Sequence, residues 1–222
     1  MEKIKAVIFD LDQTLVYTLK RFYKVYNETR EYFSLNKMSW EEFYEKFEKD
    51  TLSEDIPSDI IDEFWRRFRR EYCNHITSED GPIEGAIEIL RRLKEKNIIV
   101  IVTTGRECPP EIIRKELEYY GISEYVDDIY TLMMQEKDDE EILFERSGLL
   151  KRILRRYNLK PREVIFVGDY IPDMISGKRV GVITIGVSTG LKSPEILKEN
   201  GAEYVFDSIK DLIWFLEKMG VI

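Results

Sequence analysis

The chain has 222 residues, which is enough to bury one substantial core with or without a smaller companion domain. Its formal charge of −9, from 34 Lys and Arg against 43 Asp and Glu, argues against nucleic acid or an anionic membrane as a partner and favours a small-molecule substrate. No apolar run is long enough for a signal peptide or a membrane span, so we expect a cytoplasmic protein. The composition indicates no oligomeric state.

Strands and helices are predicted to alternate along most of the chain. Short apolar runs rich in β-branched residues predict buried strands, and apolar residues at helical spacing predict the helices between them. In chain order these are a strand at 4–9, helix at 85–96, strand at 98–102, helices at 111–120 and 149–157, strands at 164–167 and 182–187, helix at 194–200, strand at 204–206 and helix at 209–219. The alternation favours an α/β fold with an open, parallel, Rossmann-like sheet covered by helices on both faces.

Residues 17–78 interrupt this alternation. The segment contains no convincing strand and carries aromatic and charged residues at helical spacing, with Ser39 as a predicted N-cap. We expect the aromatic side chains to form the core of this insertion. Gly81 and Pro82 then mark the return to the first domain. The predicted organisation is a core domain of residues 1–16 and 79–222 with a helical domain, 17–78, inserted after the first strand.

Two carboxylates follow the first apolar run, in the sequence Asp10-Leu11-Asp12-Gln13-Thr14. Ligands of open parallel sheets bind beyond the carboxyl ends of the strands, so these residues lie where chemistry is expected. Because burying charge is costly without compensation, a bound cation is the simplest explanation for the acidic pair. A turn with solvated acids is the alternative.

The next two runs also end in polar residues. Thr103-Thr104-Gly105 offers hydroxyl and amide groups suited to an anion, and Gly168 is followed by the acidic pair Asp169 and Asp173. Acid, hydroxyl and acid at three strand ends are a much stronger signal together than any one of them alone.

These motifs resemble those of the haloacid dehalogenase-like hydrolase superfamily, whose phosphatases carry an apolar strand then DxDxT, a strand then Thr or Ser, and a strand then GDxxxD. The resemblance covers nearly the whole chain and places a helical cap at the insertion, and the closing segment 181–207 is similar to phosphoglycolate-phosphatase-type members. It implies a phosphatase acting on a small phosphorylated metabolite, with no nucleic-acid or membrane partner.

The resemblance also implies roles for individual residues. Asp10 would attack phosphorus and form an aspartyl-phosphate, and Asp12 would act as general acid and then general base. The dehalogenases of this superfamily lack an acid at the position of Asp12, which disfavours hydrolysis of a carbon–halogen bond. Thr103 and the amides of Thr104 and Gly105 would bind phosphate oxygens.

A magnesium ion is the implied cofactor. Its ligands would be a carboxylate oxygen of Asp10, the backbone carbonyl of Asp12, Asp169 and waters, an all-oxygen set that suits this ion. Asp173 would orient the site without binding the ion directly.

The chain departs from the family pattern at two positions. The family usually places a Lys before the helix preceding the third motif strand, and this chain has none there; Arg146 is the first substitute, followed by Lys151 and Lys137. A solvated surface charge is the alternative for Arg146. Gln13 replaces the usual Gly of the first motif.

The missing Lys leaves other functions open. A phosphomutase of the same superfamily would pass the phosphoryl group to a sugar, and a non-catalytic protein would keep the fold and bind phosphate. His75 is the only histidine, which argues against Ser-His-Asp and Cys-His chemistry.

Overall fold

The structure is a computed structural model that describes residues 2–136 and 142–222. The chain forms two compact units, a core unit of Met1–Tyr17 with Gly81–Ile222 and an inserted unit of Thr18–Asp80. These boundaries lie one and two residues from those predicted. No helix among the described residues is both long enough and apolar enough to cross a membrane.

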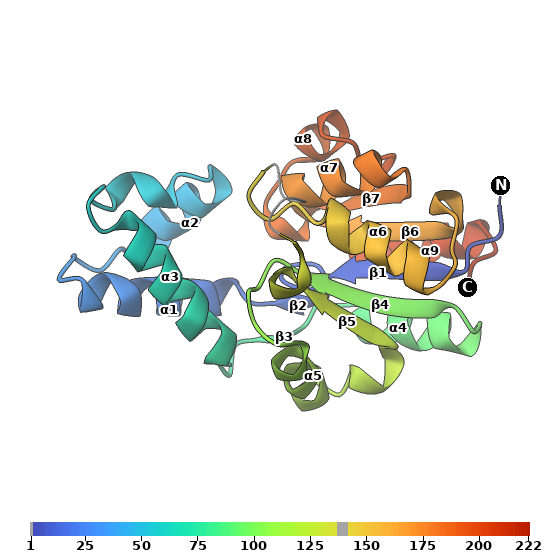
Figure 1. Cartoon of the computed structure of the whole chain (residues 1–222), viewed down its shortest axis with the longest axis horizontal. Coiled ribbons are helices and arrows are strands. Elements are labelled where there is room, and N and C mark those ends of the chain that lie inside the picture. The colour runs from blue at the N-terminus through green and yellow to red at the C-terminus, as the bar shows by residue number, and fades with distance from the viewer. Residues whose placement is uncertain (1, 137–141) are drawn as a thin grey trace. The chain divides into compact units, whose positions relative to one another are not determined.

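The core unit is built on a six-stranded sheet in the order β5-β4-β1-β6-β7-β8, in which every pairing is parallel (Figure 1). This arrangement confirms the predicted open parallel sheet. Its strands are β1 (Ala6–Asp10), β4 (Ile99–Thr104), β5 (Asp128–Thr131), β6 (Val164–Gly168), β7 (Ile183–Val187) and β8 (Tyr204–Phe206).

Helices cover both faces of this sheet. Successive side chains of a strand point to opposite faces, and Ala6, Val7, Ile8 and Phe9 of β1 are all fully buried. The helices of the core unit are α4 (Ala86–Glu95), α5 (Pro110–Tyr119), α6 (Ser147–Arg156), α7 (Ile171–Val180), α8 (Pro194–Glu199) and α9 (Ile209–Lys218), with 3-10 turns at Ser123–Tyr125, Leu132–Met134, Pro161–Glu163 and Ser188–Gly190. Helices α6, α7 and α8 pack in succession, and α4 packs against α9.

Two elements of the core unit have weak sequence signals. Strand β5 contains only four residues, and it pairs with β4 at the edge of the sheet. Helix α7 contains Pro172 in its first turn and Gly177 in its interior, a composition that obscures the helical pattern. A Cβ at Gly177 would overlap the Thr184 side chain, so the glycine allows α7 to pack closely on β7.

A two-stranded antiparallel ribbon brings together the points where the chain leaves and re-enters the core unit. Strand β2 (Val16–Tyr17) pairs with β3 (Gly81–Pro82), with Tyr17 opposite Gly81.

The inserted unit is helical, as predicted. It consists of α1 (Leu19–Tyr32), α2 (Trp40–Glu48), a 3-10 turn (Leu52–Asp55) and α3 (Ile61–Asn74). Ser39 caps α2 by accepting a hydrogen bond from the Glu42 amide. Phe22 packs against Phe43 and Phe68, and the latter two are buried, which confirms that the aromatic residues form this unit's own core.

Candidate active site

The strand order places the three predicted motifs at neighbouring strand ends. Strand β1 lies between β4 and β6, and Asp10 at its last position is in register with Thr103 of β4. Asp169 directly follows β6. The carboxyl ends of parallel strands share one edge of the sheet, so acid, hydroxyl and acid converge there.

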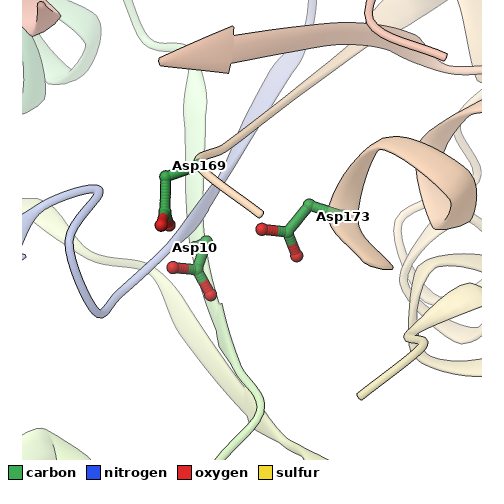
Figure 2. Close-up of side chains that lie close together, drawn as sticks. All are labelled: Asp10, Asp169 and Asp173. Carbon is green, nitrogen blue, oxygen red and sulfur yellow. The ribbon is translucent and has the colours of Figure 1, made fainter. Parts of the chain in front are cut away.

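Three carboxylates form a tight buried cluster at this edge. Asp10, Asp169 and Asp173 each place one carboxylate oxygen within 4.8 Å of the others, and all three residues are buried (Figure 2). Burial raises the pKa of Asp10, and it raises the pKa of Asp169 well above the usual range, to which the neighbouring Asp10 charge adds. The cluster therefore resists carrying three negative charges unless a cation compensates them.

Arg146 supplies part of that compensation. Its Nη1 donates to Asp10 Oδ1 over 2.6 Å, and its Nη2 forms an ion pair with Asp173. The side chain is only 4% exposed. Arg146 is thus a buried guanidinium in contact with the predicted nucleophile and not a solvated surface charge.

Neighbouring residues hold Arg146 at the start of α6. Its backbone amide donates to Ser176 Oγ on α7, and the preceding residue, Glu145, is buried and accepts two hydrogen bonds from Arg179. Lys151, the second candidate for the missing Lys, is exposed on α6. Lys137, the third, lies outside the described residues.

Two residues to which the sequence analysis gave no role support Asp169. Thr14 Oγ1 donates to Asp169 Oδ1 over 2.8 Å, and a Cβ at Gly190 would lie 1.6 Å from Asp169 Oδ2. The Thr of the DxDxT pattern was a signal for the first contact. The Gly190 contact had no such signal, because it depends on how the turn after β7 approaches the β6 end.

Asp12 lies outside the carboxylate cluster. Arg106 donates to both of its carboxylate oxygens, from Nε over 2.8 Å and from Nη2 over 2.6 Å. The Asp12 side chain is 26% exposed, compared with 8% for Asp10. The second acid of the first motif is therefore more accessible than the first and is oriented by a different arginine, one that the sequence analysis did not select.

The predicted anion-binding residues Thr103 and Thr104 end β4, and Gly105 follows it. Thr103 is fully buried, and its Oγ1 has no hydrogen-bond partner among the described residues. Thr104 Oγ1 donates to Asp12 Oδ2 over 3.4 Å and accepts from the Arg106 amide. Gly105 faces the Phe144 ring, which would lie 3.3 Å from an added Cβ. A buried hydroxyl without a partner is costly, and a bound anion would satisfy it.

The donor set fits a magnesium ion. The three clustered carboxylates carry three negative charges and Arg146 one positive charge, so this group of four retains two negative charges, which one divalent cation would neutralise. All the available donors are oxygens, as this ion requires. The side-chain cluster contains Asp173 in addition to the predicted Asp10 and Asp169, whereas the Asp12 carboxylate contacts Arg106.

The family model described as haloacid dehalogenase-like hydrolase matches residues 7–187. The chain belongs to this family. The match spans β1 to β7 and so includes all three strand-end motifs, which confirms the predicted family membership. The protein is thus a haloacid dehalogenase-like hydrolase.

Known proteins match this hydrolase along almost its whole length. The pyrophosphatase PpaX of Bacillus mycoides is 27% identical over 98% of this chain and 99% of its own, and the PpaX of Halalkalibacterium halodurans is 26% identical over 95% and 96%. A haloacid dehalogenase-like family hydrolase from Streptococcus pneumoniae superposes with a TM-score of 0.80 at 18% identity, covering 97% of this chain and 100% of its own. A predicted phosphoglycolate phosphatase from Haemophilus somnus gives 0.76 at 20%, covering 97% and 99%.

Proposed function

We propose that this hydrolase is a magnesium-dependent phosphatase that acts on a small phosphorylated metabolite through an aspartyl-phosphate on Asp10. The observation that carries the proposal is the buried Asp10 carboxylate, which shares one sheet edge with two further carboxylates, a guanidinium and the Thr103 hydroxyl, which has no partner in the part of the chain that the structure describes. That combination offers a nucleophile, a cation site and an anion-binding group together.

In the proposed reaction, an Asp10 carboxylate oxygen attacks phosphorus and the bond to the leaving oxygen breaks. Asp12 gives a proton to that oxygen and later takes one from the water that hydrolyses the aspartyl-phosphate. Thr103 and the Thr104 and Gly105 amides bind phosphate oxygens, and Arg146 opposes the repulsion between the Asp10 carboxylate and the phosphate. A magnesium ion held by Asp10, Asp169 and the Asp12 carbonyl would neutralise charge on the transferred group.

Arg146 supports catalysis over a purely binding role. The non-catalytic alternative was motivated by the missing family Lys, and a buried cation in contact with Asp10 supplies the charge that this Lys would bring. Arg is not equivalent to Lys, because its planar fork contacts Asp10 and Asp173 at the same time. We therefore expect a working site of altered efficiency.

Pyrophosphate and phosphoglycolate are the first substrates to test, because relatives and structural neighbours carry these names. The leaving groups differ: pyrophosphate releases a phosphate ion, and an ester releases an alcohol. Both reactions use the same attack by Asp10. A phosphomutase would instead need a sugar acceptor and a bisphosphate activator, and the same assays with an added activator would reveal it.

The deciding experiment measures phosphate release from 4-nitrophenyl phosphate, pyrophosphate and phosphoglycolate, with magnesium and with EDTA, by the native protein and by Asp10→Asn. We expect magnesium-dependent release by the native protein and none by the variant, which keeps the shape of the side chain but lacks the nucleophile. Asp211→Asn, in the exposed first turn of α9, is the matched control and should behave as native. Native protein inactive on all substrates, or an active Asp10→Asn, would refute the proposal.

A further inference from the structure

The guanidinium of Arg106 joins the predicted acid and base, Asp12, to a second carboxylate that the proposed reaction does not use. Arg106 donates to both oxygens of Asp12, and through Nη1 and Nη2 to the two oxygens of Glu116 on α5. The Arg106 and Glu116 side chains are 3% and 2% exposed. A buried arginine is thus held by two carboxylates, each contacted in a forked geometry.

The chain fixes this arginine from two directions. Arg106 lies in the loop that follows β4, and its amide donates to the Thr104 hydroxyl, which contacts Asp12 in turn. Glu116 lies more than a turn into α5, the helix that follows this loop. The guanidinium is therefore held by a helix, whereas Arg106 itself belongs to the loop. A long side chain restrained in this way loses the rotamer freedom that an exposed arginine keeps.

Asp12 also accepts a hydrogen bond from Thr104 Oγ1 over 3.4 Å, which is longer than either hydrogen bond from Arg106. It lies beyond the end of β1, next to Gln13, whose φ of +60° marks a sharp turn of the backbone. Its carboxylate is the part of the first motif nearest to solvent. A group that must first donate and then accept a proton needs a fixed position relative to the leaving oxygen, because misplacement weakens proton transfer steeply.

We propose that Arg106, held by Glu116, is a positioning residue that orients Asp12 toward the leaving group. The inference rests on the proposed phosphatase function and adds to it a pair of residues that acts only through Asp12. The structural cost of the pair supports a positioning role, since buried ion pairs contribute little net stability compared with apolar packing.

The test compares two esters that differ in how much they need an acid. 4-Nitrophenolate leaves readily without a proton, whereas phenolate is a much poorer leaving group, and the two phosphates are otherwise similar in shape. We expect Arg106→Gln to lower kcat/KM on phenyl phosphate at least about tenfold more than on 4-nitrophenyl phosphate, as general acid catalysis contributes typically 10²–10⁴-fold. The comparison uses kcat/KM because hydrolysis of the aspartyl-phosphate is common to both esters, and a merely structural role would lower kcat/KM on both equally.

Three further variants complete the test. Glu116→Gln, which keeps Arg106 but weakens its restraint, should change the ratio of the two kcat/KM values in the same direction by a smaller factor. In an Asp12→Asn background, Arg106→Gln should leave the ratio unchanged, because the group it positions is already absent. Arg162→Gln is the matched control: it breaks an exposed forked pair with Glu203 next to the turn before β6 and should leave both rates as native.

The outcomes separate the two proposals. A native protein that is active, with Arg106→Gln and Glu116→Gln variants that keep the native ratio of rates, overturns the positioning role alone. The same holds if Arg106→Gln changes the ratio in the Asp12→Asn background. A native protein inactive on both esters and also on pyrophosphate and phosphoglycolate overturns the phosphatase function and the positioning role with it. If Arg106→Gln does not fold, Glu116→Gln and Arg106→Lys decide by the same ratio, since Lys cannot reproduce the forked contact.

Discussion

Nη1 of Arg146 lies 2.6 Å from Oδ1 of Asp10, so a buried guanidinium contacts the predicted nucleophile where the family usually has a lysine. In Arg146→Gln the charge is lost, and we expect kcat to fall by about 10²–10³-fold. Arg146→Lys keeps a charge but loses one charge-assisted hydrogen bond, worth about 1.5–3 kcal/mol, or roughly 10- to 100-fold.

Steady-state kinetics on 4-nitrophenyl phosphate measure both losses. Arg156→Gln is the control, because Arg156 lies on the same helix and its side chain is 64% exposed. A fully active Arg146→Gln would show that the guanidinium is dispensable.

Magnesium should stabilise the protein more at neutral than at acid pH. In the metal-free protein the pKa values of Asp10 and Asp169 are raised, so the folded state holds protons more tightly than the unfolded state. Their contribution to stability is therefore present below the usual pKa of 3.8 and is lost as pH rises through the raised values. A bound cation removes this loss.

Thermal unfolding across a pH series, with and without magnesium, tests whether the stabilisation by magnesium depends on pH. The increase in Tm caused by magnesium should grow with pH. An increase that is the same at every pH would exclude these two carboxylates as its source.

Gly190→Ala should weaken the metal site. An added Cβ would lie 1.6 Å from Asp169 Oδ2, so either the carboxylate or the turn after β7 must move. We expect Gly190→Ala to need a higher magnesium concentration for half-maximal activity than the native protein. Its Tm should change little. Gly81→Ala is the control, since a Cβ there meets no atom within 4 Å. Unchanged magnesium dependence in Gly190→Ala would contradict the assignment of Asp169 as a ligand.

Asp80→Asn should destabilise the inserted unit. Arg21 Nε donates to Asp80 Oδ2 over 2.9 Å, and both side chains are fully buried. Removing the carboxylate charge breaks this buried ion pair, at a cost of about 3–5 kcal/mol. The matched control is Asp55→Asn, which breaks a partly exposed pair with Lys46 and should cost at most about 1 kcal/mol.

Hydrogen exchange locates the effect of Asp80→Asn. Protection should fall within residues 18–80 and remain elsewhere. Equal loss of protection in the core unit would show that the two units unfold together.

Local sequence patterns predicted most of the core because buried parallel strands have a strong signature. The runs at 6–9 and 164–167, for example, are continuously apolar, whereas the order of the strands in the sheet was not predicted. Strand β5 lacked that signature because it has four residues at a sheet edge. Helix α7 was not predicted because Pro172 and Gly177 interrupt the helical spacing of its apolar residues. Gly177 instead allows α7 to pack closely on β7.

The site was predictable where the motif itself carries the chemistry. Asp10 and Thr103 lie at the ends of β1 and β4, and Asp169 directly follows β6, so their convergence follows from the sheet. The partner of Asp12 was not predictable, because Arg106 lies in the loop after β4 and Glu116, which also holds it, lies on α5, and no local pattern encodes how that loop and helix pack. Arg146 could be proposed only as one of three candidates for the same reason.

The β2–β3 ribbon has a consequence for how this architecture can diversify. Tyr17 and Gly81 face each other in an antiparallel pair, so the 63 residues between them join two points already at hairpin spacing. The entropy of closing such a loop grows only as the logarithm of its length, about 0.6 kcal/mol for each doubling. During evolution this segment can therefore be lengthened, shortened or exchanged at small thermodynamic cost. The sheet edge that carries Asp10 and Asp169 stays the same, so proteins with the same reaction can differ in the substrates they accept.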